Sequence, residues 1–120
     1  MNTIAEKKLP EEIQYIVDAL DDKRGKDITV LDLREVSESI DFFILATAES
    51  SLQINALEQH VKEQLKERGF PAKAVEGPSQ RWVLIDYGFT IVHIMSPDAR
   101  EFYDLEGLWA DAEQLVVVPS

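Results

Sequence analysis

The spacing of apolar residues predicts a helix near the start of the chain, over residues 10–24. Leu9, Ile13, Ile16, Val17 and Leu20 recur at intervals of three and four residues, so they would share one side of that helix. A proline and two glutamates open the segment, and a Lys-Arg pair followed by glycine closes it. Both ends therefore suit the helix dipole and the usual stop signal.

Two strands and a second helix are expected next. Residues 28–33 alternate between apolar and polar positions, whereas residues 42–47 form a denser apolar run of the kind that is buried on both faces. Ser50 and Gln53 resemble a capping box, and a helical apolar period then continues up to Gly69. The residues of that period are Leu52, Ile54, Leu57, Val61 and Leu65.

Three shorter strands are predicted in the second half, over residues 72–75, 81–86 and 90–95. Residues 76–79 and the Tyr87-Gly88 pair would form the turns between them, so the last two strands make a hairpin. Ser-Pro-Asp at residues 96–98 predicts the cap and first turn of a short helix through about Tyr103. Residues 104–109 are interpreted as irregular chain.

The order of these elements, α-β-β-α-β-β-β-α, predicts a single α/β domain over residues 1–120 with a mixed sheet flanked by helices. A strand–helix–strand crossover over the second helix is expected to be parallel, whereas the final hairpin is antiparallel. A chain of 120 residues with 45% hydrophobic content can bury one core without covalent cross-links. The strand-to-helix turn at residues 47–51 gives the layout a nucleotidyltransferase-like topology.

Charge and composition narrow the classes of partner. A net charge of −11 repels phosphate backbones and attracts basic surfaces, so we expect no direct nucleic-acid binding. The acidity is equally compatible with simply keeping a cytosolic protein in solution. With no cysteine and two histidines, neither a metal nor another cofactor is expected. No apolar run is long enough to span a bilayer, so we expect a soluble, cytoplasmic protein with no membrane partner.

Catalytic chemistry has weak support in the sequence. His93 lies mid-strand with Asp86 across the predicted hairpin, but no exposed nucleophile accompanies the pair, so a structural or interface histidine is the better interpretation. An active nucleotidyltransferase would need a glycine where Ala48 stands and two closely spaced strand carboxylates, and the chain has neither. We therefore predict no catalytic residue and no enzyme. A divergent nucleotidyltransferase-like enzyme or nucleotide-binding protein remains the alternative.

Aromatic residues are concentrated in the last third of the chain: Trp82, Tyr87, Phe102, Tyr103 and Trp109. Any one of them alone is better explained as part of the core. Complete burial of the whole group is harder, because several fall at a strand start, a turn and a loop. The group therefore predicts one exposed apolar patch of the kind found at protein–protein contacts.

Several short segments, in this order, resemble the ribosomal silencing factor family, also called the Iojap family, over residues 20–111. They are Asp-Ile at 27–28 with Leu-Asp at 31–32, Asp-Phe-Phe-Ile at 41–44, Glu-Gly at 76–77, Trp-Val-Leu-Ile-Asp-Tyr-Gly at 82–88, Val-His-Ile-Met at 92–95, Arg-Glu-Phe-Tyr-Asp-Leu-Glu at 100–106 and Leu-Trp at 108–109. Any one segment alone would be weak evidence, whereas the ordered combination is specific.

The resemblance implies a non-enzymatic factor that binds the large ribosomal subunit through large-subunit ribosomal protein fourteen. Such a factor prevents association of the two subunits and represses translation under nutrient limitation. Homodimers are frequent in the family, so a homodimer is implied as well. The resemblance and the aromatic cluster together predict a partner-binding surface made of Trp82, Asp86, Tyr87, His93, Arg100, Tyr103, Leu105, Glu106, Leu108 and Trp109.

Two residues depart from the family pattern. Ala48 stands where the family usually has the glycine of a Thr-Gly pair, which affects the geometry of the strand-to-helix turn. Phe89 stands where many members carry aspartate after the glycine of the hairpin turn, which removes an acidic group near the expected interface.

Overall fold

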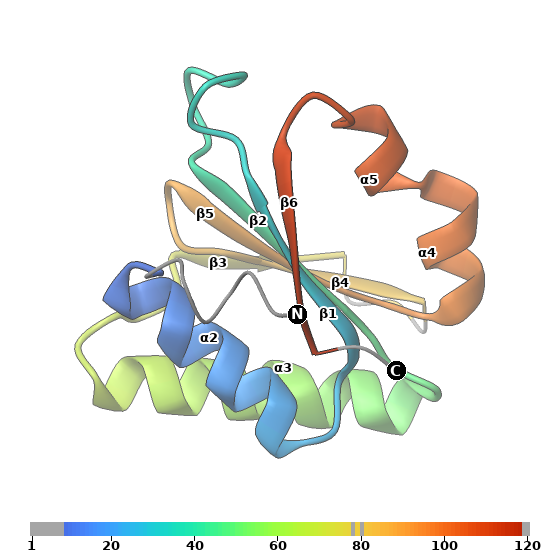
Figure 1. Ribbon diagram of the computed structural model, residues 1–120. Coiled ribbons are helices and arrows are strands. Elements are labelled where there is room, and N and C mark those ends of the chain that lie inside the picture. The colour runs from blue at the N-terminus through green and yellow to red at the C-terminus, as the bar shows by residue number, and fades with distance from the viewer. Residues whose placement is uncertain (1–8, 78, 80, 119–120) are drawn as a thin grey trace.

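A six-stranded mixed sheet with helices on both faces forms the molecule (Figure 1). The computed structural model describes residues 9–77, 79 and 81–118. The strands lie in the order β3-β4-β5-β2-β1-β6. Their bounds are β1 Lys26–Asp32, β2 Phe42–Thr47, β3 Ala74–Glu76, β4 Trp82–Asp86, β5 Thr90–Met95 and β6 Glu113–Val118.

The helices differ in length between the two faces. On one face lie the long helices α2 (Glu11–Asp22) and α3 (Ser51–Glu67), and on the other lie the short helices α4 (Pro97–Tyr103) and α5 (Leu105–Leu108) (Figure 1). Within the described residues, no helix is long and apolar enough to cross a membrane. The short helices leave part of their face uncovered, and the candidate site lies there.

Side-chain caps place the starts of α3 and α4 where the sequence predicts them. The Ser50 hydroxyl accepts a hydrogen bond from the Gln53 amide at 3.1 Å, and the Ser96 hydroxyl accepts one from the Ala99 amide at 3.1 Å. Each bond satisfies an amide that the first turn of a helix leaves unpaired. The predicted helices are thus confirmed, with α2 beginning one residue later and ending two residues earlier than the expected range of 10–24.

The strand directions also agree with expectation. β2 pairs with β5 in parallel, and β5 pairs with β4 as an antiparallel hairpin. The crossover through α3 leads from β2 to β3, an edge strand that runs parallel to β2 but lies beyond β5 and β4. The mixed α/β sheet predicted from the element order is confirmed.

Strand β3 lies at Ala74–Glu76 rather than at residues 72–75, so Glu76 belongs to the strand and not to the turn. Two further elements were not predicted at all, and both lie near the end of the chain. A sixth strand, β6, pairs antiparallel with β1, with Asp32 opposite Glu113. Residues 105–108 form helix α5 rather than irregular chain. Asp104 adopts a left-handed backbone conformation (φ 44°) between α4 and α5, and its carboxylate accepts a hydrogen bond from the Gly107 amide at 3.1 Å.

The sheet separates two apolar clusters. The larger cluster packs α2 and α3 against one face and contains residues such as Ile16, Leu57 and Ile85. The smaller cluster lies under α4 and α5 and consists of Leu31, Leu33, Leu45, Met95, Ala99 and Leu105. Both clusters are buried, but the smaller one is bordered by the half-buried rings of Phe43, Trp82 and Trp109. The face under α4 and α5 is therefore only partly covered.

Candidate surface for partner binding

Alternation along β4 divides the predicted surface residues between the two faces. Trp82, Leu84 and Asp86 point to the partly covered face, because successive side chains of a strand point to opposite sides. Tyr87 is an odd number of positions from Trp82 and joins the core beneath the long helices, where it is only 7% exposed. Burial, with a contribution from the Glu12 carboxylate, raises the pKa of the Tyr87 hydroxyl. The prediction that Tyr87 is exposed in the patch is wrong.

Six rings follow one another across the partly covered face, and we call them the aromatic patch. In order of contact they are Phe102, Tyr103, Trp82, His93, Phe43 and Trp109. The Trp82 and Tyr103 ring centroids are 4.6 Å apart, as are those of Phe43 and His93. These separations are typical of packed aromatic pairs, so the six rings form one contiguous cluster.

The two ends of the patch differ in exposure. Phe102 is 76% exposed and Tyr103 is 47% exposed, while Trp82, Phe43 and Trp109 are half-buried. Leu108 on the neighbouring helix α5 is 73% exposed. Exposed apolar side chains in this number on one side of a small domain indicate a surface for a partner.

A shallow hollow of about 410 Å³ adjoins Trp82 at the β3–β4 edge of the sheet. Its lining consists of Glu76, Gly77, Ser79, Trp82 and Leu84. Glu76 lies opposite Leu84 in the strand register, so it adds a carboxylate beside an apolar floor. The hollow can accept an apolar or long-stemmed basic side chain of a partner.

His93 lies inside the patch and is only 3% exposed. The indole N–H of Trp82 donates a hydrogen bond to Nδ1 of His93 at 3.1 Å. Burial, helped by the Arg100 charge, lowers the pKa of His93 to about 4, so the ring is neutral at pH 7. Its Nε2 is buried and has no hydrogen-bond partner in the part of the chain that the structure describes.

The His93–Asp86 pair considered from the sequence is not formed. Leu84 lies opposite His93 in the hairpin, whereas Asp86 lies opposite Ile91. The Asp86 carboxylate instead accepts a hydrogen bond from the Gly88 amide at 2.7 Å. A histidine with this partner and this pKa is a poor general base near neutral pH.

Arg100 and Glu106, both predicted to contact the partner, are bound to each other. An Arg100 Nη2 to Glu106 Oε2 distance of 2.6 Å defines the ion pair, and the same guanidinium donates to the Thr47 and Thr29 hydroxyls at 3.0 and 3.1 Å. These bonds connect α4 and α5 to β2 and β1. Leu105 is also buried, at 8% exposure. The structure therefore buries Leu105 and holds the partly buried Arg100 and Glu106 side chains in an internal ion pair, while Tyr103, Leu108 and Trp109 are more accessible to a partner.

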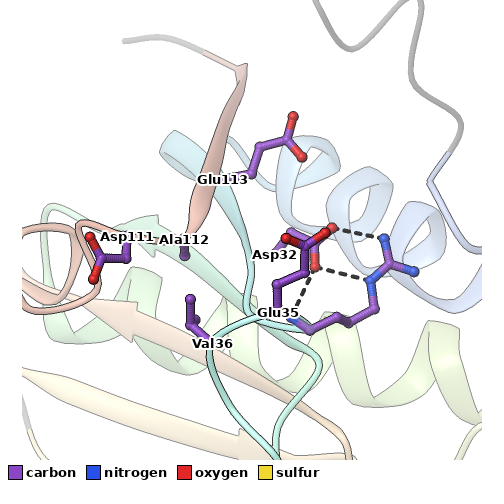
Figure 2. A pocket seen from close by; sticks show the side chains of 7 residues that line it. Asp32, Glu35, Val36, Asp111, Ala112 and Glu113 are labelled. Carbon is purple, nitrogen blue, oxygen red and sulfur yellow. Dashed lines mark hydrogen bonds and ion pairs between the residues drawn. The ribbon is translucent and has the colours of Figure 1, made fainter.

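An acidic pocket of about 300 Å³ lies toward the opposite edge of the sheet from β3 and β4, between the end of β1 and the start of β6 (Figure 2). Its lining consists of Asp32, Arg34, Glu35, Val36, Asp111, Ala112 and Glu113. Arg34 forms two side-chain hydrogen bonds to the Asp32 carboxylate, at 3.0 and 2.7 Å. No group of three or more His, Cys, Asp or Glu side chains suited to a metal ion is found in the described ranges.

Comparison with known proteins gives the family. The family described as "Ribosomal silencing factor during starvation" matches residues 6–119. The chain belongs to this family. Ribosomal silencing factor RsfS of Bacillus subtilis is 41% identical over 95 residues, which cover 78% of this chain and 80% of that one. A crystal structure of a Chromobacterium violaceum protein, 37% identical, matches with a TM-score of 0.81 over 87% of this chain and 88% of that one.

A more distant relative has a different name. The mouse protein named "Mitochondrial assembly of ribosomal large subunit protein 1" is 28% identical over 102 residues, which cover 82% of this chain and 45% of that protein. The family resemblance inferred from the sequence segments is thus confirmed. The bacterial relative is named as a silencing factor and not as an enzyme.

Sequence reasoning omitted Phe43, Leu84 and Glu76 from the predicted surface. Phe43 lies within an apolar run that reads as buried on both faces, yet it is half-buried and meets both His93 and Trp109. Leu84 shares the parity of Trp82, so strand alternation alone would have indicated it. Nothing in the sequence marks Glu76, because its place in the hollow depends on the register between β3 and β4.

Proposed function

We propose that this protein is a ribosomal silencing factor that acts in the cytoplasm and binds the large ribosomal subunit. It binds through large-subunit ribosomal protein fourteen, prevents association of the two subunits and represses translation under nutrient limitation. Family membership supports the ribosomal role, and the name of the mouse relative supports the large subunit as the target.

The observation that carries the proposal is the aromatic patch on a sheet face that α4 and α5 leave partly uncovered. Trp82 packs against Tyr103 with the two rings tilted by 49°, and Phe102 and Leu108 extend the apolar surface outward. Tryptophan and tyrosine are enriched among residues that dominate binding energy, because each buries a large rigid area. Docking would cover apolar surface that water now contacts.

Charge supports a basic partner. The net charge is −11, and Glu76 adds a carboxylate to the hollow beside Trp82. Lysine and arginine side chains of a ribosomal protein would meet a complementary field around the apolar centre. Such complementarity mainly speeds encounter and selects the partner, while the aromatic contacts supply most of the affinity.

The block on subunit joining follows from size. The molecule measures 34 × 33 × 30 Å along its principal axes. A body of that thickness, bound on the face that the small subunit uses, prevents the two subunits from approaching. The mechanism requires occupancy and no reaction.

Co-sedimentation with purified bacterial large subunits tests the proposal, together with light scattering to follow subunit joining. We expect the protein to pellet with large subunits and to reduce joining in proportion to occupancy. Absence of binding would contradict the proposed function. Magnesium-dependent nucleotide binding, measured by calorimetry, would favour the alternative of a nucleotide-binding protein.

The homodimer stays a prediction. Phe102 and Leu108 are exposed apolar residues of the kind that two-fold contacts bury. Sedimentation equilibrium of the wild type against Leu108→Ser measures whether this surface joins two copies. A dimer through the patch would compete with subunit binding.

A further inference from the structure

The Trp82 indole is held by a hydrogen bond as well as by ring contacts. Its N–H donates to Nδ1 of His93 at 3.1 Å, and its ring packs against Tyr103 at a centroid distance of 4.6 Å. A neutral imidazole carries one proton, so a ring that accepts at Nδ1 carries that proton on Nε2. One protonation state of His93, and one tautomer, can therefore hold the indole.

We propose that His93 is a positioning residue of the docking surface, whose neutral imidazole fixes the orientation of the Trp82 ring before a partner arrives. The inference rests on the proposed function, because it concerns the same surface. His93 itself is 97% shielded from solvent and makes no direct contact with the partner; it acts through Trp82.

The surroundings of His93 show that packing alone does not require a histidine. The residues opposite it on β2 and β4 are Leu45 and Leu84, and its β5 neighbours on the same face are Ile91 and Met95. An apolar side chain would suit this environment. The histidine instead leaves Nε2 buried with no hydrogen-bond partner among the described residues, which lowers stability. Compared with an apolar residue at this position, histidine adds one specific interaction, the hydrogen bond from the Trp82 indole.

Holding the indole in advance increases affinity because a mobile side chain must lose its freedom when a partner binds. Beside Trp82 lies the open hollow of about 410 Å³, which gives an unrestrained indole room to change orientation. Tyr103, which packs against the Trp82 ring, is itself 47% exposed. The bond from His93 supplies the restraint from within the patch.

The first measurement observes the indole directly, by NMR of the ¹⁵N-labelled protein. The chain has two tryptophans, so Trp109 provides an internal control signal. His93→Leu removes the acceptor, whereas His93→Asn keeps an acceptor near the position of Nδ1. We expect exchange of the Trp82 indole proton with water to increase about tenfold in His93→Leu, to change little in His93→Asn and to stay constant at Trp109.

The second measurement is affinity for purified bacterial large subunits, paired with thermal melting. We expect His93→Leu to weaken binding about five- to tenfold while the melting temperature stays constant or rises, because the buried unpaired Nε2 is gone. His93→Asn should restore most of the affinity. If His93 served only the fold, His93→Leu would lower the melting temperature, and its affinity would fall only because less of the protein is folded.

Trp82→Phe removes the indole N–H and keeps a ring, so it completes a double-mutant cycle. We expect His93→Leu to cause no further loss of affinity when Trp82 is already phenylalanine. Binding of His93→Leu or Trp82→Phe within twofold of the wild type would overturn the inference, and so would additive losses. Should His93→Leu fail to fold, His93→Phe, which also lacks the acceptor, takes its place in the cycle. Failure of the wild type to bind subunits would instead reject the proposed function, whatever the indole signal shows.

Discussion

Trp82 and Tyr87 lie five positions apart and on opposite faces of the sheet, although both are aromatic and both belong to one sequence segment. Trp82 is half-buried in the aromatic patch, whereas Tyr87 belongs to the core beneath α2 and α3. The odd separation decides this, because strand side chains alternate between faces. The two residues therefore make a matched pair for separating binding from stability.

We predict that Trp82→Ala weakens large-subunit binding by about 2 kcal/mol or more, which corresponds to roughly 30-fold in Kd. Titration of labelled protein against large subunits measures this loss. Tyr87→Phe serves as the control: it removes a buried hydroxyl that has no partner among the described residues, so binding should be unchanged and stability equal or slightly higher. Equal affinity of Trp82→Ala and wild type would remove Trp82 from the interface. A collapsed melting temperature would assign Trp82 to the core.

His93 makes stability depend on pH. The pKa of His93 falls from 6.5 to about 4 in the folded protein, so the unfolded chain binds more protons between these values. The free energy of unfolding is then fully retained above about pH 6.5 and decreases as the pH falls toward 4. Between pH 7 and pH 5 this group alone removes about 2 kcal/mol.

Urea unfolding at pH 7 and pH 5 tests this dependence, with His93→Asn as the comparison. Asparagine does not titrate, so the variant should lose about 2 kcal/mol less between the two pH values. The carboxylates are common to both proteins and cancel in the difference. Equal losses would mean that the histidine is not held neutral in the folded state.

At the scale of elements, Arg100 binds Glu106 and the Thr47 and Thr29 hydroxyls, and we call these contacts the Arg100 network. The network holds α4 and α5 on the sheet and thereby positions Tyr103 and Trp109. We predict that Arg100→Met lowers the free energy of unfolding by about 2 kcal/mol, because Glu106 loses its ion pair and the buried Thr47 hydroxyl loses the Arg100 donor. The Thr29 hydroxyl loses the same donor but keeps its own hydrogen bond to the Asp27 carbonyl. Subunit affinity should fall as well, since the patch depends on the position of these helices. Denaturant unfolding and subunit titration measure the two effects.

The exposed Asp32–Arg34 pair provides the control for that experiment. Arg34 is 55% exposed, against 12% for Arg100, so Arg34→Met should cost less than about 1 kcal/mol and leave binding unchanged. Restoration of most of the stability in the double variant Arg100→Met with Glu106→Leu would confirm that an unpaired carboxylate causes the loss. Similar costs for the Arg34 and Arg100 variants would contradict a special role for the network.

Local signals predicted α3 and α4 well, because each start is fixed by a hydroxyl cap within the same few residues. β6 was not predicted, since its pairing with β1 joins segments about eighty residues apart and carries no local turn signal. α5 follows a left-handed conformation of Asp104, which residues other than glycine seldom adopt, so little in the sequence indicated a new helix there.

The residues of the candidate site also divide into those with a local sequence signal and those placed by contacts between distant segments. Trp82 and Tyr103 could be predicted, as large aromatic residues grouped in one part of the sequence. The internal role of Arg100 could not, because its partner Thr29 is 71 positions away and is brought near only by the sheet. The sequence shows that a charged side chain can form an ion pair, but only the fold shows whether the other group belongs to a partner or to the same chain.

At the scale of the whole molecule, the charge of −11 would meet two opposing fields at the proposed target, a ribosomal protein embedded in RNA. A basic protein there would attract the acidic chain and the surrounding phosphates would repel it, and salt screens both fields over roughly 10 Å at 0.1 M. If the aromatic patch supplies most of the affinity, raising salt should slow association with isolated ribosomal protein fourteen and change dissociation little.

On whole large subunits the salt effect should be smaller or reversed in sign, because screening also relieves the repulsion from RNA. Stopped-flow association on both targets over a salt series measures this difference. Replacing Glu63 and Glu67 by glutamine on α3, on the covered side of the sheet, provides the matched variant: it reduces the field without touching the patch, so it should change only the association rate. A steep loss of affinity with salt on whole subunits, like that of a phosphate-binding protein, would show that contacts with RNA rather than aromatic docking hold the factor in place.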